Sequence, residues 1–229
     1  MILRAEKLTM RYMRRTGQAN YFYAVKDASL QLRPGEVTVL MGRSGSGKTT
    51  LLHMLSGLLT PTGGRVLLGD TDLYALGDKA LSRLRNGKIA VVPQGRSAID
   101  SLTVLENVLL PGTMVGLEDK KTARRWLEAL GIEHLADARP AELSGGELRR
   151  MAIARALARN PAVLLADEPT GDLDDASTRR VLDILRDAAR ERGVAVLIVS
   201  HDSEAASCAD VMARMDGGVL TVTGKSKAE

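Results

Sequence analysis

The apolar positions in the first and last thirds of the chain form short runs that predict β-strands. Residues 37–41, 163–166 and 194–199 are compact apolar runs, which are typical of strands buried on both faces of a sheet. A helical segment, at about 181–189, separates the last two of these runs. Strands that alternate with helices in this way favour a mostly parallel sheet.

Other segments of the first third predict strands of a different kind. Residues 2–8 and 25–32 alternate partly between apolar and polar side chains, which predicts half-buried strands. The basic and aromatic segment 11–23 between them predicts a loop. An Asp-Gly turn at 216–217 predicts a closing hairpin near the C-terminus. Two further short strands are expected, at 65–68 and 89–92.

Helical spacing of apolar residues follows residue 47 and dominates the middle of the chain. Leu51, Leu52, Leu55 and Leu59 predict a helix that Gly57 interrupts near its end. In the middle, the apolar positions with helical spacing are Val104, Val108, Leu109, Ala123, Trp126, Leu127 and Leu130. This pattern predicts a helical subdomain at about 95–159, inserted into an α/β core.

The length and composition fit one globular domain that spans residues 1–229. The chain has 45% hydrophobic and 26% charged residues, which is ordinary for a soluble protein. We therefore expect an α/β fold whose core occupies about 1–94 and 160–229, with an N-terminal antiparallel β subdomain and the helical subdomain inserted between the two halves.

Charge and cysteine content exclude little. The net charge of +4 permits an anionic partner without selecting one, and the dispersed Arg-Arg pairs at 14–15, 124–125, 149–150 and 179–180 are interpreted as solvated faces. Cys208 is the single cysteine, so no intrachain disulfide can form, which fits a reducing cytosolic setting. The first residues do not resemble a signal peptide, and no apolar run is long enough to span a membrane.

The glycine-rich loop after the strand at 37–41 matches a phosphate-binding P-loop in sequence and context. Its glycines let backbone N–H groups turn toward phosphate oxygens, and the helix that follows adds its positive N-terminus. Lys48 can reach the β- and γ-phosphates, and the Thr49 hydroxyl can ligate Mg²⁺. The predicted nucleotide-binding residues are Gly42, Arg43, Ser44, Gly45, Ser46, Gly47, Lys48, Thr49 and Thr50.

Two carboxylates follow the apolar strand at 163–166. Ligands of open α/β sheets bind at the carboxyl ends of strands, which is where Asp167 and Glu168 lie. Asp167 is placed to hold Mg²⁺, directly or through water, and Glu168 to orient and polarise an attacking water. The simpler interpretation, an acidic turn after a strand, loses weight because a P-loop is present in the same chain.

The segment Leu143-Ser144-Gly145-Gly146-Glu147 has a structural and a functional interpretation. Ser144 and Glu147 have the spacing of a capping box at the start of a helix. A helix N-terminus with two glycines also exposes backbone donors to an anion. Because the P-loop already serves one set of phosphates, this second site suggests contact with the nucleotide of another molecule.

The P-loop, the LSGGE segment and the run from Leu165 to Asp174 together resemble the nucleotide-binding subunit of ABC transporters, in order and spacing, over essentially the whole chain. Most P-loop proteins lack the LSGGE segment. The resemblance implies a P-loop NTPase core, ATP and Mg²⁺ as ligands, and hydrolysis of ATP. It also implies a second ATPase subunit, with a homodimer favoured, whose Ser144, Gly145 and Gly146 contact the nucleotide on the first.

The resemblance also implies roles for residues outside these segments. Gln94 resembles the glutamine that touches Mg²⁺ and links to the membrane partner, and His201 the histidine that contacts the γ-phosphate. Asp174 resembles a residue of the dimer interface. Tyr12 resembles the aromatic that stacks on adenine, with Phe22 and Tyr23 as rivals. The catalytic set is thus Lys48, Glu168 and His201, and the metal ligands are Thr49, Gln94 and Asp167. His53 and His134 match no motif and are interpreted as structural.

The implied partner is a membrane permease on another chain, with this subunit peripheral at the cytoplasmic face of the membrane and no nucleic acid expected. The run Asp-Glu-Pro-Thr-Gly-Asp-Leu-Asp from Asp167 is similar to that of the lipoprotein-release, macrolide-export and cell-division group. Asp172, where Asn is usual, and the unusual segment 93–97 depart from this group. Export or mechanotransmission is favoured over import. A soluble ABC-type machine acting on ribosomes or DNA and a small-molecule kinase are weaker alternatives.

Overall fold

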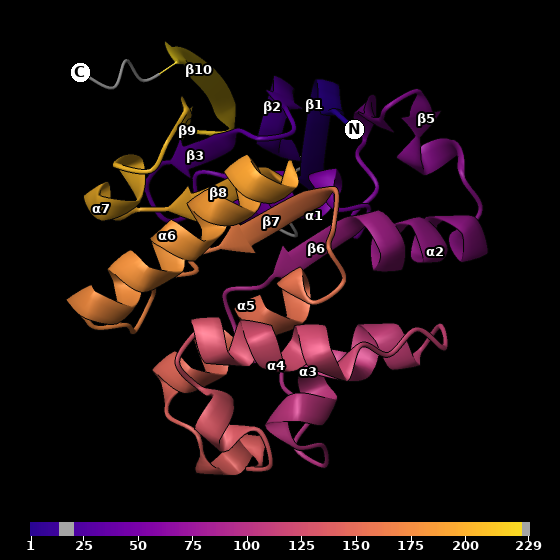
Figure 1. The fold of residues 1–229 in the computed structure, drawn as a ribbon. Helices are drawn as coiled ribbons and strands as arrows, with labels where there is room; N and C mark the ends of the chain where they lie inside the picture. Colours follow the sequence, from indigo (N-terminus) through magenta and orange to yellow (C-terminus); the bar gives the residue numbers. More distant parts are fainter. Residues whose placement is uncertain (14–20, 226–229) are drawn as a thin grey trace.

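The computed structural model describes residues 1–13 and 21–225 of the 229-residue chain. Strands and helices alternate along most of this length (Figure 1). The strands are β1 (Leu3–Met13), β2 (Tyr21–Leu32), β3 (Val37–Met41), β4 (Gly63–Leu68), β5 (Thr71–Asp72), β6 (Ile89–Val92), β7 (Val163–Asp167), β8 (Ala195–Ser200), β9 (Val211–Asp216) and β10 (Val219–Lys225). The α-helices are α1 (Lys48–Leu55), α2 (Asp78–Lys88), α3 (Val104–Thr113), α4 (Lys120–Ala129), α5 (Gly145–Leu157), α6 (Asp175–Arg192) and α7 (Ser203–Ala206). Short 3₁₀ turns lie at Leu73–Ala75, Glu133–Leu135 and Pro140–Glu142.

The strands of the described residues form one mixed sheet in the order β5-β4-β1-β2-β10-β9-β3-β8-β7-β6. β9, β3, β8, β7 and β6 pair in parallel, whereas β1 pairs antiparallel with β2 and β4. All residues of β7 and β8 are buried, as their uninterrupted apolar runs predict. The α/β fold class, with its parallel core and N-terminal antiparallel strands, is therefore confirmed, and so is the closing hairpin of β9 and β10.

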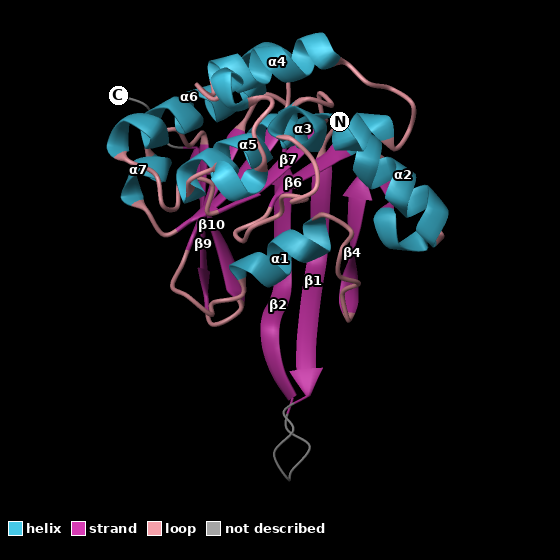
Figure 2. Cartoon of the chain, turned by 90° about the horizontal axis from the view of Figure 1, so that it is seen from below, coloured by secondary structure: helices cyan, strands magenta, loops and turns pink. Residues whose placement is uncertain are grey.

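Alternate residues of the central strands face two separate apolar clusters, one on each side of the sheet. Leu164, Val196 and Ile198 pack with α3, α4, α5 and α6 in one cluster. Leu165 and Leu197 pack with α1, β1 and β2 in the other. Figure 2 shows α1 lying across β1 and β2, while α5 and α6 lie over the part of the sheet that contains β6 and β7. The helix that follows the glycine-rich loop is thereby fixed between two layers of strands.

The prediction of a loop at 11–23 is wrong for both of its ends. β1 continues to Met13 and β2 begins at Tyr21, with Tyr12 opposite Phe22 in the antiparallel register. The two rings lie 5.6 Å apart between centroids, and aromatic cross-strand pairs of this kind stabilise a hairpin. Residues 14–20 of the predicted loop, with the pair Arg14-Arg15, lie outside the described residues.

Helices α3, α4 and α5 lie in the sequence between β6 and β7, and they gather away from the antiparallel strands in Figure 1. The helical spacing expected for the middle of the chain is therefore confirmed, while the subdomain boundaries of about 95–159 stay a prediction. α1 ends at Leu55, before the expected Leu59, and Gly57 follows with a φ of 74°. Among the helices of the described residues, none is long and apolar enough to cross a membrane.

Candidate functional site

The glycine-rich loop joins the carboxyl end of β3 to the start of α1, and two of its glycines are required by close packing. Gly47 has a φ of 105°, and a Cβ there would collide with the carbonyl oxygen of Ala24. A Cβ at Gly42 would collide with the carbonyl oxygen of Met215. The loop is thus pressed against β2 and β9, which leaves its opposite side, with Arg43, Ser44 and Gly45 exposed, open to a ligand.

The N-terminus of α1 is open to an anion. Its N-cap residue, Gly47, provides no side-chain cap, and the first turn holds no acidic residue. Leu51 N–H donates to the Gly47 carbonyl at 2.9 Å, so the N–H groups of the three preceding residues have no acceptor within the helix. Ser46 adds a buried hydroxyl that has no hydrogen-bond partner. These donors fit phosphate oxygens.

Lys48 lies beside these donors and is buried. Its Nζ donates to the carbonyl oxygens of Gly42 at 2.8 Å and Arg43 at 3.1 Å. The ammonium is therefore held over the loop in which the phosphates are expected, and it adds a full positive charge to the helix terminus. Thr50 lies half-buried in the same first turn of α1.

Thr49 and Asp167 meet at the carboxyl ends of β3 and β7. Thr49 Oγ1 donates to Asp167 Oδ2 at 2.8 Å. Burial raises the pKa of Asp167 above its ordinary value, and the hydrogen bond from Thr49 acts in the opposite direction. A hydroxyl beside a carboxylate suits Mg²⁺, which takes one or two protein oxygens and completes its shell with phosphate and water. Among the described residues no cluster of three or more His, Cys, Asp or Glu offers an alternative, all-protein metal cage.

Glu168 and His201 form the second pair at this edge. His201 Nδ1 lies 2.9 Å from Glu168 Oε1. The hydrogen bond with Glu168, and then its charge, raise the pKa of His201. Glu168 has a φ of 50°, a backbone conformation that costs about 1–3 kcal/mol for a non-glycine residue. Its N–H donates to the Val199 carbonyl at 2.8 Å, which holds the turn in place.

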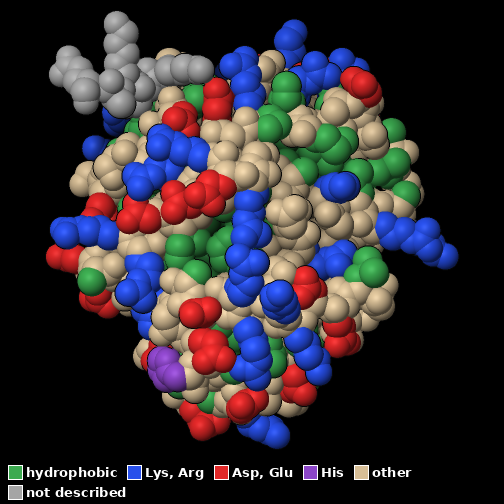
Figure 3. All heavy atoms as spheres, in the orientation of Figure 1, with side chains coloured by type: hydrophobic (Ala, Val, Ile, Leu, Met, Phe, Trp, Pro, Cys, Tyr) green, Lys and Arg blue, Asp and Glu red, His purple; other side chains and the backbone are tan. Residues whose placement is uncertain are grey.

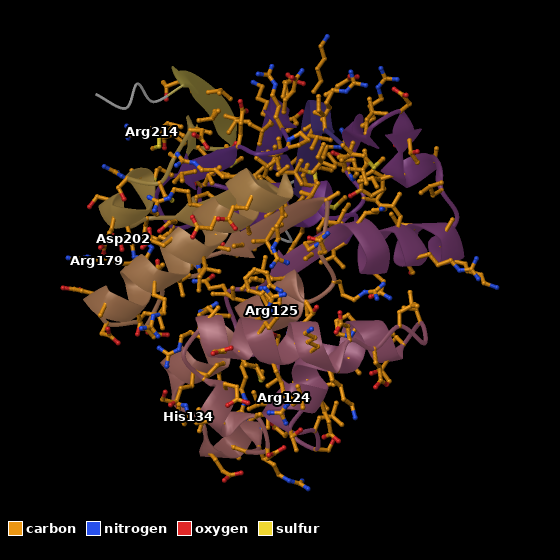
Figure 4. The ribbon with its side chains drawn as sticks, in the orientation of Figure 1. Arg124, Arg125, His134, Arg179, Asp202 and Arg214 are labelled. Carbon is orange, nitrogen blue, oxygen red and sulfur yellow. The ribbon has the colours of Figure 1, made fainter. Side chains whose placement is uncertain are left out.

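The Glu168–His201 pair opens into a cleft of about 410 Å³ that Thr170, Gly171 and Asp202 also line. Asp202 caps α7, and Figure 4 shows it close to Arg179 of α6, whose guanidinium donates to Glu204 at 3.2 Å. A carboxylate aimed into an open cleft and paired with a histidine can accept a proton from water. The structure thus brings together Glu168 and His201, two residues that the sequence analysis lists separately as catalytic candidates.

Ser144 and Glu147 form the predicted capping box at the start of α5. Glu147 N–H donates to Ser144 Oγ at 3.3 Å, and Ser144 N–H donates to Glu147 Oε2 at 2.8 Å. Hydrogen bonds from Ser144 lower the pKa of Glu147. Gly145 is exposed, with open space where a side chain would be, and no hydrogen bond joins Ser144, Gly145 or Gly146 to the glycine-rich loop in the described part of the chain.

Gln94 lies exposed in the segment after β6, and its carbonyl accepts a hydrogen bond from Arg149 Nη2 at 2.6 Å. A cleft of about 300 Å³ contains Gln94 together with Gly145, Arg149 and Asp172. Within the described residues, no hydrogen bond joins Gln94 to Thr49 or Asp167. The structure therefore places Gln94 beside α5, without a hydrogen bond to either of its two predicted partners in metal binding.

The remaining candidate residues are spread over the molecule. Asp174 caps α6, accepting from Ser177 N–H at 2.9 Å, and this bond and that of the Ser177 hydroxyl lower the pKa of Asp174. Tyr12 is about one-third exposed on β1, beside Phe22 on β2, and Tyr23 is more exposed. His134 lies in a 3₁₀ turn at the far end of the helical region (Figure 4), and His53 lies on α1.

The interpretation of the Arg-Arg pairs as solvated faces is wrong for Arg149 and Arg150. Both are half-buried on α5, where Arg149 bonds the carbonyls of Pro93 and Gln94 and Arg150 bonds the Ser177 hydroxyl. The dispersed basic residues elsewhere are interspersed with acidic side chains on the face shown in Figure 3. Sequence reasoning missed the contact of α5 with Pro93 and Gln94, because no local signal marks it.

Comparison with known proteins gives consistent matches. A family model described as ABC transporter matches residues 25–171. The ABC transporter ATP-binding protein YtrE of Bacillus subtilis (strain 168) is 39% identical over 207 residues, which is 89% of this chain and 90% of that protein. The dimeric post-hydrolysis structure of the ATP-binding cassette MJ0796, bound to ADP and Pi, has a TM-score of 0.91 at 32% identity, and covers 99% of this chain and 100% of that one. A second dimeric structure of MJ0796, a bacterial ABC transporter cassette, has a TM-score of 0.90 at 33% identity with the same coverage.

Proposed function

Since the chain belongs to the ABC transporter family as an ATP-binding subunit and ABC ATPase, we propose that it hydrolyses Mg-ATP to drive a separate membrane permease. One observation carries the hydrolytic part. The Thr49–Asp167 and Glu168–His201 hydrogen bonds, at 2.8 and 2.9 Å, collect four candidate residues from three separate segments at one edge of the sheet. That edge is where the uncapped start of α1 offers its phosphate donors.

Each candidate residue takes a defined part in this proposal. The N–H groups of the glycine-rich loop, with Ser46 and Lys48, bind the triphosphate. Thr49 and Asp167 hold Mg²⁺, with Gln94 approaching from the segment after β6; the ion neutralises charge on the phosphates when bound. Glu168 accepts the proton of the attacking water, and His201 orients Glu168 and faces the γ-phosphate. Tyr12 stacks on adenine.

The proposed active form is a head-to-tail homodimer. Ser144, Gly145 and Gly146 of one copy contact the nucleotide on the P-loop of the other, with Asp174 near the interface. The exposed glycine at the start of α5 supports this arrangement, and both MJ0796 cassettes are described as dimeric. ATP favours closure because only the closed pair adds the second set of donors.

The helices between β6 and β7 form the helical subdomain, at about 95–159, and the permease supplies the membrane-spanning part. We place the subunit at the cytoplasmic face of the membrane.

The run from Asp167 to Asp174 supports the export or mechanotransmission group, with import as the alternative. Isolation of the native complex with a solute receptor of the kind that serves importers would contradict the export assignment. Sedimentation of the subunit with membranes in the absence of any permease would contradict attachment through the permease.

Replacement of the proposed general base tests the hydrolytic mechanism directly. Glu168→Gln should lower ATP turnover by about 10²–10⁴-fold, because a proton acceptor is lost while the phosphate donors are kept. ATP should remain bound and should shift the variant from monomer to dimer in analytical ultracentrifugation. Glu118→Gln, at an exposed position outside the site, is the matched control. Near-normal turnover in Glu168→Gln would remove Glu168 from its role.

A further inference from the structure

Two arginines of α5 hold the backbone of the segment that contains Gln94. Arg149 donates from Nη1 to the Pro93 carbonyl at 2.8 Å and from Nη2 to the Gln94 carbonyl at 2.6 Å. Six residues further along α5, Arg155 donates to the Ser97 carbonyl at 2.8 Å and to its hydroxyl at 2.5 Å. The segment 93–97 is thereby fixed to α5 at both of its ends.

These contacts decide how the segment can move. It follows the last residue of β6 and has no strand or helix of its own, so the arginines bind carbonyls that no strand or helix satisfies. Hydrogen bonds from a guanidinium are among the stronger ones in proteins, and a bidentate set fixes orientation as well as position. Arg96, between the two anchored ends, points elsewhere and pairs with Asp100 at 2.6 Å. The backbone around Gln94 therefore moves with α5.

The same helix begins at the second proposed phosphate site. Gly145 is the first residue of α5, and Arg149 lies about one turn further along. A single turn of helix is stiff, so a shift of Ser144–Gly146 displaces Arg149 and, through its two hydrogen bonds, Gln94. Gln94, Gly145, Arg149 and Asp172 line one cleft, which brings the segments before α3, α5 and α6 to the same place.

We propose that Arg149 is a positioning residue that couples the two ATP sites, by linking Gln94 at one nucleotide to Ser144–Gly146 at the other. This inference rests on the proposed function, because it requires the dimer in which α5 faces the partner's nucleotide. When α5 docks on that nucleotide, Arg149 sets the distance of Gln94 from the chain's own metal site. Closure at one site then changes the geometry of the other through Arg149.

The test compares Arg149→Met with Gln94→Ala and with the double variant. Methionine keeps the length of the aliphatic stem and removes the donors. Arg149→Met should lower kcat for Mg-ATP about tenfold, with KM changed less than about twofold, because the position of Gln94 matters during closure and not in first binding. In the Gln94→Ala background the same substitution should change kcat by less than about twofold, since the side chain that it positions is gone. Arg149→Lys, with one donor group left, should recover part of the loss.

Arg96→Met is the matched control, because Arg96 lies in the same segment but bonds only Asp100 among the described residues. It should leave kcat unchanged. Independent, multiplicative losses for Arg149→Met and Gln94→Ala, or a wild-type kcat in Arg149→Met, would overturn the coupling. A purely structural role would lower kcat equally in both backgrounds.

Backbone ¹⁵N NMR relaxation separates failure of this inference from failure of the proposed function. In the nucleotide-free chain, Arg149→Met should lower the backbone order parameters of residues 94–96 from about 0.85 to below about 0.6, and Arg96→Met should not. Unchanged order parameters at 94–96 would overturn the role of Arg149 in holding this segment, whatever the ATPase activity. Absence of ATP binding and hydrolysis by the wild-type chain, by contrast, would overturn the proposed function and with it the coupling of two ATP sites.

Discussion

The starts of α1 and α5 are both proposed to face phosphate, yet they are built in opposite ways. α1 begins after Gly47 with no side-chain cap, no acidic residue in its first turn and a buried Lys48 beside it. α5 begins after Ser144, whose hydroxyl closes a capping box with Glu147. An uncapped helix start leaves backbone donors that only a ligand or water can satisfy. A capped start is already stable, because its cap contributes about 1 kcal/mol without any ligand.

The difference predicts an order of events. The start of α1 gains most from an anion, so we expect nucleotide to bind there first and at a single subunit. The start of α5 keeps the N–H groups of Gly145 and Gly146 as its free donors, and we propose that these act only when a second copy brings a bound phosphate to them. ATP-dependent association should therefore follow ATP binding, and the two helix starts should respond differently to mutation.

The largest expected difference comes from Lys48, which belongs to α1 alone. Lys48→Ala should weaken ATP binding by about 10–100-fold, the equivalent of one or two charge-assisted hydrogen bonds. A fluorescent ATP analogue, titrated at concentrations at which the chain stays monomeric, measures this effect. Because the start of α5 is proposed to contact only a partner's nucleotide, substitutions in its cap should leave ATP binding by the monomer unchanged in the same titration.

Lys79→Ala is a suitable control, since Lys79 is exposed on α2 and keeps the change in net charge the same. It should bind the analogue as the wild type does. An unchanged affinity in Lys48→Ala would contradict the assignment of the loop before α1 as the phosphate site, and the contrast between the two helix starts would collapse.

The next effect separates stability from association at α5. Ser144→Ala should lower the free energy of unfolding by about 1 kcal/mol, the usual contribution of an N-cap side chain. Thr103→Ala, which removes the equivalent capping box of α3 with Glu106, should cost a similar amount. Chemical denaturation of both variants measures this pair of losses, and their agreement would show that the two caps are equivalent as local structure.

Only Ser144→Ala should also weaken the ATP-dependent dimer, by about fivefold, because its hydroxyl and helix start lie at the proposed interface. Sedimentation in the Glu168→Gln background, where ATP is retained, measures this second effect. Equal dimer affinities in the Ser144→Ala and Thr103→Ala variants would mean that the start of α5 is a capped helix and nothing more.

The sequence predicts those features of the candidate site that depend on residues close together in the chain. Asp167 and Glu168 follow an uninterrupted apolar strand, and Ser144 and Glu147 have the spacing of a capping box. Gly47 stands where the chain needs a positive φ and the closest approach to β2. These features depend on a few neighbouring residues, which is why the sequence alone located them.

Features that depend on distant partners could not be predicted in this way. α2 buries only Leu81 among its eleven residues, so no apolar stripe along its sequence predicts the helix. The extension of β1 and β2 past Arg11 and Tyr23 depends on pairing across the hairpin. Arg149 reaches a carbonyl 55 residues away in the chain. No pattern within α5 distinguishes such an arginine from a solvated one.

The smallest expected effect is a shift in the pKa of His201. It depends on Glu168 and on Lys48 of α1, and not on α5. The Glu168 hydrogen bond raises the pKa of His201, while the Lys48 charge lowers it. The pair therefore contributes stability below about pH 6.5, the ordinary histidine pKa, and loses it as the pH rises through the raised value. His201 is largely exposed, so the contribution is small.

In the nucleotide-free chain, imidazole NMR titration should give a lower His201 pKa in Glu168→Gln, a higher one in Lys48→Ala and the wild-type value in Ser144→Ala. His201→Gln assigns the resonance among the three histidines. A shift in Ser144→Ala as large as that in Lys48→Ala would show that α5 reaches the chain's own catalytic edge, and the separation of the two helix starts would fail.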